Sequence, residues 1–473
     1  MGSQKKRKIV ILGAGLAGLS AAWKLSEEGH GVTVIEKRTL VGGLCDTAEY
    51  KNFLFDFGGH RFITKNENII KEIKELMGSD FWTNQRKTQY FLWHKYLNYP
   101  LELKDLILKI NPLISARAVA DYFWTVIKNK IKPMPEDSFE DWTVKRFGRT
   151  LYTIFFGQYT EKFWGISPKQ IDKEWASQRI SLLNLWDVFK KLIIKPKNEP
   201  RTYTNDYYYC TYGIGQIAEK MAEVIRKNGG KIYLGAKILD IKHNSSGKIV
   251  SVRFQSGEEI KEESGDYFLS TIPINALINY LTPTVSVSVK KASDALRFRS
   301  LVFLNILINQ ERVTDNDAFY IPEPKYFFTR MIQYKLWSGK MAPNGKTSLQ
   351  LEMGCFFNDE IWNMSAQELY AKCLPSLRAM GLIKDEKIIL DYFSFKGKEV
   401  YPLLKIGYRE NISAVRNYLN TIDNLAYFGR QGNFQYIHMH HVIEMGFRAT
   451  QWIDGLLPRE EINKIGTGAE YFG

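Results

Sequence analysis

The sequence contains little cysteine, with 4 residues in 473. Cys45, Cys210, Cys355 and Cys373 are scattered along the chain, and no Cys-x-x-Cys pair occurs among them. A disulfide framework or a cysteine-ligated zinc site needs more cysteines at closer spacing, so neither organises this fold. A reducing compartment is favoured, and we expect the protein to be cytoplasmic.

The sequence also has no long apolar run. A transmembrane helix needs roughly 18 or more consecutive apolar residues, and no segment reaches this length. Residues 5–8 are basic and precede an apolar segment, as in a signal peptide. The acidic pair Glu27 and Glu28 and the second apolar segment at 32–35 argue against that interpretation. We therefore predict a protein without a membrane-spanning segment.

Acidic residues are outnumbered, with 51 Asp and Glu against 65 Lys and Arg and a formal net charge of +14. This excess favours an anionic partner such as a nucleoside diphosphate, a nucleic acid or an anionic membrane. The basic residues are dispersed, and only residues 5–8 form a short run. We therefore expect no nucleic-acid binding, and a solvated basic surface is the alternative explanation.

The stretch 8–36 carries the clearest local pattern. An apolar segment at 8–12 predicts a buried parallel strand, and Gly13, Gly15 and Gly18 follow it in a Gly-x-Gly-x-x-Gly pattern. These glycines allow a tight turn and a close approach to a pyrophosphate, which the N-terminus of the next helix attracts. Glu36 ends the second strand, at the distance expected of a ribose-binding acid. The pattern predicts dinucleotide binding.

A second glycine pair, Gly42 and Gly43, comes shortly after Glu36. With it, the sequence resembles the superfamily of FAD-binding amine oxidases, protoporphyrinogen oxidases and UDP-galactopyranose mutases. The resemblance implies FAD as cofactor. The residues that it assigns to FAD are Gly13, Gly15, Leu16, Ala17, Gly18, Glu36, Lys37, Gly42, Gly43, Gly59, His60, Ile238, Gly429, Arg430 and Met439.

The segment 159–165, Tyr-Thr-Glu-Lys-Phe-Trp-Gly, closely resembles a run in bacterial UDP-galactopyranose mutases. The resemblance implies that Tyr159 and Trp164 line a pocket for the nucleotide base. Aromatic faces suit this role because they stack on any base. The alternative is that both side chains belong to a helix packed in the core.

The same resemblance assigns two arginines to the substrate diphosphate, Arg179 on a mobile loop and Arg330 on a strand. Guanidinium groups bind phosphate through paired hydrogen bonds. His60 would lie beside the flavin ring, so the expected catalytic residues are His60, Arg179 and Arg330. Further expected substrate contacts are Tyr203, Tyr401 and Tyr436. The alternative for His60 is a surface histidine in a turn, and the alternative for Arg330 is an arginine on the solvent face of a sheet.

The resemblance fails at His438, where the mutases usually carry an acidic residue. The identity of the sugar and the charge near the flavin are open at this point. His440 and His441 follow closely, but no carboxylate or cysteine set accompanies them, and we expect no metal site.

The expected fold is α/β, with a Rossmann-like FAD-binding domain of the kind found in these flavoproteins. This domain is discontinuous, from residues 1–100, 201–297 and 403–473. A helical domain at 101–200 and an antiparallel sheet domain at 298–402 would hold the substrate. Lys128, Lys130 and Lys132 leave a peripheral membrane contact open, although a packed helical domain is the more ordinary interpretation. Homo-oligomers are also open.

The function favoured by this resemblance is a flavin-dependent nucleotide-sugar mutase that interconverts pyranose and furanose rings. The implied chemistry needs reduced FAD and passes through a covalent flavin–sugar adduct, with a nucleoside-diphosphate sugar as substrate. One alternative is an FAD-dependent oxidoreductase of the protoporphyrinogen or amine oxidase type. The other is a non-catalytic binding protein that contains FAD.

Overall fold

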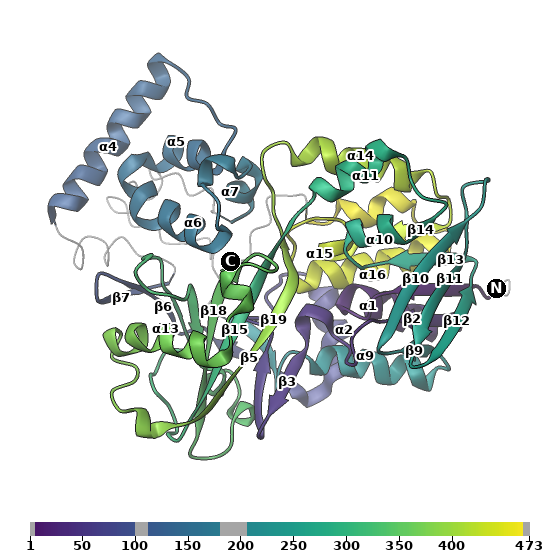
Figure 1. Ribbon diagram of the computed structural model, residues 1–473, viewed down its shortest axis with the longest axis horizontal. Coiled ribbons are helices and arrows are strands. Elements are labelled where there is room, and N and C mark those ends of the chain that lie inside the picture. The colour runs from purple at the N-terminus through teal and green to yellow at the C-terminus, as the bar shows by residue number, and fades with distance from the viewer. Residues whose placement is uncertain (1–4, 100–111, 180–205, 467–473) are drawn as a thin grey trace.

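The computed structural model describes residues 5–99, 112–179 and 206–466. Figure 1 shows a lobe built on parallel strands, a lobe built on a large antiparallel sheet, and a group of helices, α4 to α7, beside the second lobe. Within the described ranges no helix has both the length and the apolar character that crossing a membrane requires.

The first lobe is centred on a five-stranded parallel sheet in the order β20-β13-β1-β2-β9. Its strands are β1 (Lys8–Leu12), β2 (Gly31–Ile35), β9 (Lys231–Tyr233), β13 (Tyr267–Ser270) and β20 (Leu425–Tyr427). Ile9 and Ile11 of β1 pack into the core under α1 (Leu16–Glu27), α9 (Gln216–Lys227) and α16 (Met439–Ile453). Val10 and Leu12 pack into a separate core on the other face. Both faces are covered, which explains the continuous apolar run of β1.

That second core also contains a smaller sheet in the order β12-β11-β10-β14. Its strands are β10 (Ala236–His243), β11 (Ile249–Ser256), β12 (Glu259–Ser264) and β14 (Leu281–Thr282). The helices around it are α10 (Ile274–Tyr280), α11 (Val287–Ala295) and α14 (Tyr408–Asn420). The lobe is completed by α2 (Glu67–Met77), by the hairpin of β3 (Thr47–Tyr50) and β4 (Phe53–Asp56), and by the pair β5 (Phe81–Gln85) and β8 (Asp206–Cys210).

The second lobe is a seven-stranded sheet in the order β19-β15-β18-β17-β16-β6-β7. Its strands are β6 (Thr88–Leu92), β7 (Lys95–Asn98), β15 (Phe298–Ile308), β16 (Ala318–Tyr320), β17 (Arg330–Ile332), β18 (Thr347–Cys355) and β19 (Ile389–Pro402). The helices α12 (Glu360–Asn363) and α13 (Ala366–Ala379) accompany it. One expectation needs correction. Residues 88–98 belong to this sheet and not to the cofactor domain, because β6 pairs with β16. Every residue of β15 and β18 is buried, so both faces of the sheet are covered along these strands.

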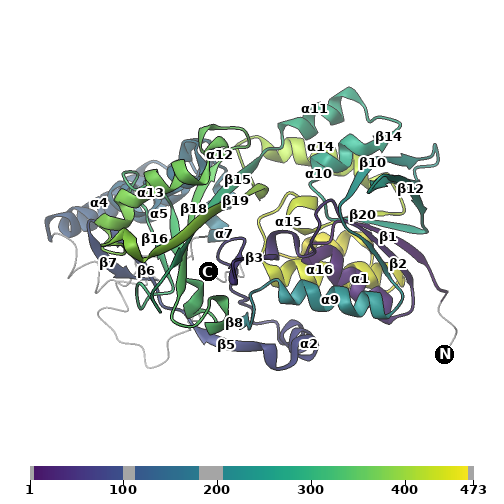
Figure 2. The ribbon, with the colours of Figure 1, turned by 60° about the horizontal axis from the view of Figure 1, so that its bottom comes forward.

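The helical group comprises α4 (Pro112–Ile131), α5 (Phe139–Leu151), α6 (Gln158–Trp164) and α7 (Lys173–Arg179). Ser138 caps α5, because its hydroxyl accepts from Asp141 N while the Asp141 carboxylate accepts from Ser138 N. A π-helical turn, Tyr152–Gly157, connects α5 to α6. Figure 2 shows the same arrangement from another side, with α4, α5 and α7 next to the antiparallel sheet.

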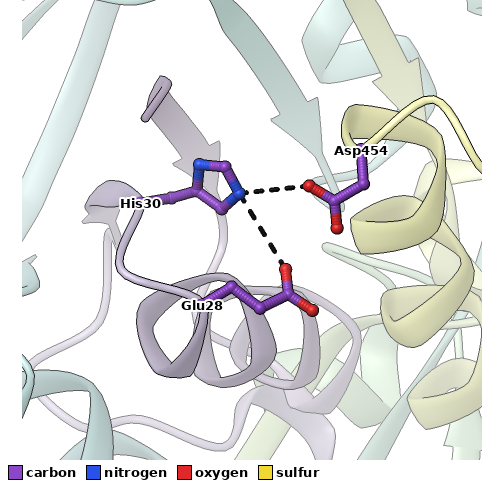
Figure 3. A group of neighbouring side chains, drawn as sticks. All are labelled: Glu28, His30 and Asp454. Carbon is purple, nitrogen blue, oxygen red and sulfur yellow. Dashed lines mark hydrogen bonds and ion pairs between the residues drawn. The ribbon is translucent and has the colours of Figure 1, made fainter. Parts of the chain in front are cut away.

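One polar cluster joins the end of α1 to the end of α16 (Figure 3). His30 Nε2 lies 3.2 Å from an Asp454 oxygen and 3.9 Å from a Glu28 oxygen. Burial, together with a hydrogen bond to Asp454 and the negative charge of Asp454, raises the pKa of Glu28 to about 7. Glu28 therefore takes up a proton more readily in the folded protein than in the unfolded chain.

The raised pKa of Glu28 predicts that the folded protein loses stability as pH rises from 4.5 to 7. A carboxyl group with a raised folded-state pKa stabilises the fold fully below its ordinary pKa of 4.5, and this contribution is lost as pH rises toward 7. Glu28→Gln mimics the protonated form and should raise the melting temperature at pH 8. It should also flatten the decline between pH 4.5 and 7. Glu27→Gln, one residue earlier, is the matched control. Parallel pH profiles for wild type and Glu28→Gln would contradict the prediction.

Candidate functional site

The Gly-x-Gly-x-x-Gly segment forms a tight turn between β1 and α1. Gly13 has a φ of +100°, which a residue with a side chain rarely adopts, and its N–H donates to Ile35 O at 2.9 Å. A Cβ on Gly18 would lie 2.1 Å from Gly13 O, so only glycine allows this close packing of helix on strand. Leu16, Ala17 and Gly18 begin α1, whose first N–H groups have no acceptors within the helix. This end of α1 suits an anionic group.

Glu36 is held beside this turn. One carboxylate oxygen accepts from Ala14 N at 2.8 Å and the other from Arg38 N at 2.8 Å. The residue is 7% exposed. Strand β10 begins close to Glu36, because Ala236 N donates to Glu36 O at 2.8 Å. This contact brings Ile238 of β10 toward the same end of the parallel sheet.

The second glycine pair lies against the first. Gly42 N donates to Ala14 O at 2.8 Å, and a Cβ on Gly43 would lie 3.1 Å from Gly15 Cα. Arg38, which the sequence interpretation did not select, fixes this loop by donating to Gly43 O at 2.6 Å and to Asp46 at 2.8 Å. These close backbone approaches fit a dinucleotide. The expected contact from Lys37 has less support, because its side chain is 68% exposed and lies 3.7 Å from Glu399.

A third loop completes the cradle after β20. Gly429 has a φ of +85°, and a Cβ there would lie 3.0 Å from the Ala17 Cβ at the start of α1. The short helix α15 (Gly429–Gly432) follows, and α16 begins at Met439. The three glycine-containing segments thus meet at the N-terminal end of α1.

Next to this cradle is a cavity of about 110 Å³. Seven of the predicted site residues line it: Gly59, His60, Arg330, Tyr401, Arg430, Tyr436 and Met439. Residues that the sequence interpretation missed also line it, among them Arg61 and Arg86. The structure thus gathers residues from β17, from β19 and from loops before α2 and α16.

Arg330 forms a two-pronged ion pair with Glu352 of the neighbouring strand β18. Arg330 Nε donates to one carboxylate oxygen at 2.8 Å, and Nη2 donates to the other at 2.7 Å. The Glu352 side chain is 2% exposed, and Gly59 N also donates to it at 3.3 Å. The alternative of a solvent-facing arginine is wrong. The sequence signal for Glu352 was a lone acidic residue within the apolar strand 347–355.

Arg430 is held between two tyrosines. Its guanidinium carbon lies 5.3 Å from the ring centres of both Tyr401 and Tyr436. Its Nε and Nη2 donate to Ile437 O at 3.0 and 2.6 Å. The guanidinium orientation is therefore fixed by packing before any ligand arrives.

His60 is an uncharged hydrogen-bonding group. Its Nδ1 lies 3.2 Å from Gly58 O, and because a carbonyl only accepts, Nδ1 carries the proton and Nε2 is an acceptor. Burial, followed by the charges of Arg430 and Arg330, lowers the pKa of His60 to about 3. The alternative of a surface histidine is therefore not supported.

The expected nucleotide pocket is less well supported. Trp164 is 1% exposed and packs edge-on against Trp175 at 4.8 Å, so it belongs to the core, which was the alternative interpretation. Tyr159 is half-buried, and its ring lies 6.2 Å from Tyr320. Arg179 is the last residue of α7 and not part of a loop, and its side chain lies outside the described residues. Tyr203 also lies outside them.

Lys162, within the 159–165 segment, makes a structural contact that the sequence interpretation did not select. Its Nζ donates to the carbonyls of Ile321, Glu323 and Phe328 at 2.9, 3.1 and 2.7 Å. Burial lowers the pKa of Lys162 to about 7, but three acceptors need the three N–H groups of the ammonium form. Lys162 thus ties α6 to the loop between β16 and β17, which ends at Arg330.

Metal-ligating side chains come together in one place in the described part of the chain, at Glu28, His30 and Asp454. Arg7 N donates to His30 Nδ1 at 3.1 Å, so Nε2 carries the proton and has no lone pair for a metal ion. The rings of His438, His440 and His441 lie 3.9 to 6.0 Å apart, but these residues do not form such a group.

Comparison with known proteins agrees with this geometry. Residues 16–394 match the family of flavin-containing amine oxidoreductases. A probable UDP-galactopyranose mutase of Klebsiella pneumoniae is 27% identical over 173 residues, which cover 35% of this chain and 43% of the mutase. Coproporphyrinogen III oxidase of Bacillus subtilis (strain 168) is 21% identical over 457 residues, covering 88% of this chain and 92% of the oxidase.

The chain spans about half the length, or less, of the first curated relatives that it matches. Among solved structures, reduced UDP-galactopyranose mutase superposes with a TM-score of 0.84 at 20% identity, over 99% of this chain and 100% of that chain. At this identity the superposition shows a shared fold. Because the family match covers more than half of the sequence, the chain belongs to the flavin-containing amine oxidoreductase family, with FAD as its cofactor.

Proposed function

We propose that the protein is a flavin-dependent nucleotide-sugar mutase, which interconverts pyranose and furanose rings. The observation that carries the proposal is the cationic cavity beside the glycine cradle, where Arg330 and Arg430 face a common space with Tyr401 and Tyr436. A site of this composition suits an anionic substrate. An amine substrate, which is a cation, would be repelled by it.

The residues of this chain have defined tasks under this proposal. The glycine segments and Glu36 would hold FAD, and the chemistry that reduced FAD supplies is electron-pair donation to the anomeric carbon of the sugar. Breaking the glycosidic bond leaves negative charge on the diphosphate. Arg330, Arg430 and the tyrosine hydroxyl groups would stabilise that charge without reorganising, because their positions are set in advance. When the diphosphate returns to the anomeric carbon, no net redox change has occurred.

Arg330 has the features of a preorganised group. Glu352 engages Nε and Nη2, so the guanidinium plane is fixed, and Nη1 is the group nearest to Gly59. His60 presents Nε2 as an acceptor in the same cavity, where a sugar hydroxyl could donate to it.

A second candidate is oxidation of a porphyrinogen. The match to coproporphyrinogen III oxidase spans 92% of that enzyme, twice the share of the mutase match. A porphyrinogen with carboxylate side chains is also an anion and would meet the same arginines. The two candidates differ in their demand on the flavin, since an oxidase consumes an oxidant in proportion to product and a mutase does not.

The deciding experiment uses purified holoenzyme with a panel of nucleotide sugars, including UDP-galactose. After dithionite reduction under nitrogen we expect a furanose product detectable by anion-exchange chromatography. The oxidised enzyme is the control and should be inactive. Oxygen uptake and hydrogen peroxide in proportion to product with coproporphyrinogen, and no furanose from any nucleotide sugar, would favour the oxidoreductase instead.

Arg330→Lys should lower kcat/KM by about 10²–10³, the range that follows loss of one preorganised donor to a developing anion. Lysine retains the charge opposite Glu352 but cannot form the two-pronged contact. The loss should fall mainly on kcat, since the diphosphate gains charge in the transition state. Arg312→Lys, at a solvent-exposed arginine of the same lobe, is the matched control. If Arg330→Lys retains the wild-type kcat, Arg330 does not act on the substrate in the candidate site.

The lowered pKa of His60 predicts that the pH profile of the reaction rate contains no step from this histidine. Because its pKa is lowered to about 3, the rate should show no protonation of His60 between pH 5 and 9. His60→Gln should reduce turnover while the shape of the pH profile stays the same. The folded protein should also lose stability as pH falls from 6.5 toward 3, since the unfolded chain protonates this histidine first. A step near pH 6.5 that disappears in His60→Gln would refute the assignment.

A further inference from the structure

A second and larger space lies on the opposite side of the loop that carries Tyr436. This crevice measures about 750 Å³ and lies between α14, the short 3-10 helix Arg459–Lys464 and the edge strand β20. It lies outside the glycine cradle. Tyr436 and His438 line both this crevice and the cavity at His60, so the loop is a common wall.

Three arginines line the crevice, and two of them are already engaged. Arg409 pairs with Asp172 at 3.3 Å and Glu174 at 2.6 Å. Arg459 donates three hydrogen bonds to backbone carbonyls, those of Asn420, Ile422 and Leu425. These two side chains stabilise the walls.

Arg416 differs from both. Its Nη2 donates to Asn433 O at 2.7 Å, but its buried Nε has no acceptor in the described part of the protein. No carboxylate of the described residues forms an ion pair with it, and burial lowers its pKa. Glu174, the carboxylate that acts electrostatically on Arg416, is itself ion-paired with Arg409. A buried cation without an ion-pair partner is costly, and a bound anion would lower that cost.

The crevice also contains acceptors that need donors. The side-chain oxygens of Asn433 and Asn463 are buried, and neither receives a hydrogen bond from any described residue. The amide nitrogen of Asn433 donates to Gln435 Oε1, and that of Asn463 donates to Tyr427 O. Ligand hydroxyl groups could donate to these oxygens. The walls therefore combine a site for an anion with sites for hydroxyl groups.

We propose that this crevice is a second binding site, which takes a small hydroxylated phosphate of the sugar-phosphate class. The phosphate pairs with Arg416, and sugar hydroxyl groups donate to the Asn433 and Asn463 oxygens. Aromatic side chains of Tyr408 and Tyr427 form apolar parts of the wall. Because Asn433 O holds Arg416 and the same loop continues to Tyr436, occupancy also stabilises the wall of the candidate active site.

The test is calorimetric titration of the FAD-loaded enzyme with α-D-glucose 1-phosphate. Wild type should bind it, and Arg416→Gln should raise Kd by about tenfold or more, as expected for loss of a charge-assisted contact. Glucose should bind much more weakly than its phosphate. Arg409→Gln, on the same crevice but already ion-paired, is the control and should change Kd by less than about twofold.

Arg330→Lys separates this crevice from the cavity at His60, because it should leave the Kd for glucose 1-phosphate unchanged. Arg416→Lys keeps a cation and should bind more tightly than Arg416→Gln, which guards against a folding defect in the latter. No binding by wild type at millimolar probe would overturn the proposal. Equal binding by Arg416→Gln and wild type, or loss of binding in Arg330→Lys alone, would also overturn it. None of these outcomes depends on the proposed mutase activity.

Discussion

The candidate site depends on one buried ion pair, Arg330 with Glu352. Glu352 accepts two hydrogen bonds from Arg330 and one from Gly59 N, so a single carboxylate joins the antiparallel sheet to the cofactor lobe. The fit leaves no room for side chains on the loop, since a Cβ on Gly58 would lie 2.9 Å from Glu352 and one on Gly59 would lie 3.0 Å from Arg330. A buried ion pair seldom adds net stability, because desolvation opposes its attraction. Its clearest effect here is geometric, since it fixes the Arg330 guanidinium in the cavity beside the glycine cradle.

The strand register explains why the pair lies where it does. Residues opposite one another on successive strands form a single row across the sheet: Phe395, Phe303, Glu352, Arg330, Tyr320 and Tyr90. Side chains alternate between faces along a strand, so all members of a row share one face. A shift of one residue in β17 would turn Arg330 to the other face and replace it with Thr329 or Met331. Lys162 opposes such a shift, because its three carbonyl acceptors fix the loop before β17.

The geometry of the glycine cradle could be predicted from the sequence, and the lining of the neighbouring cavity only in part. The turn Gly13–Gly18 and the partner Glu36 lie within one β-α-β unit, so their spacing along the chain almost determines their spacing in space. Glu352 and Lys162 act through strand register and long-range packing, which no local pattern specifies. The burial of Trp164 against Trp175 depends on the same long-range packing, so the sequence alone could not show it. Strands β6 and β7 likewise join the distant sheet through pairing with β16.

The arginines give the cavity a charge that does not change near neutral pH. His60, His440 and His441 add no charge there, because burial lowers the pKa of His60 and His440 to about 3 and that of His441 to about 4. The mutases that the sequence resembles usually carry an acidic residue where this chain has His438. An acid there would offset part of the charge of the cavity arginines, and its replacement by histidine removes that offset. The cavity is consequently more cationic than the resemblance alone implies, which favours ligands with more negative charge.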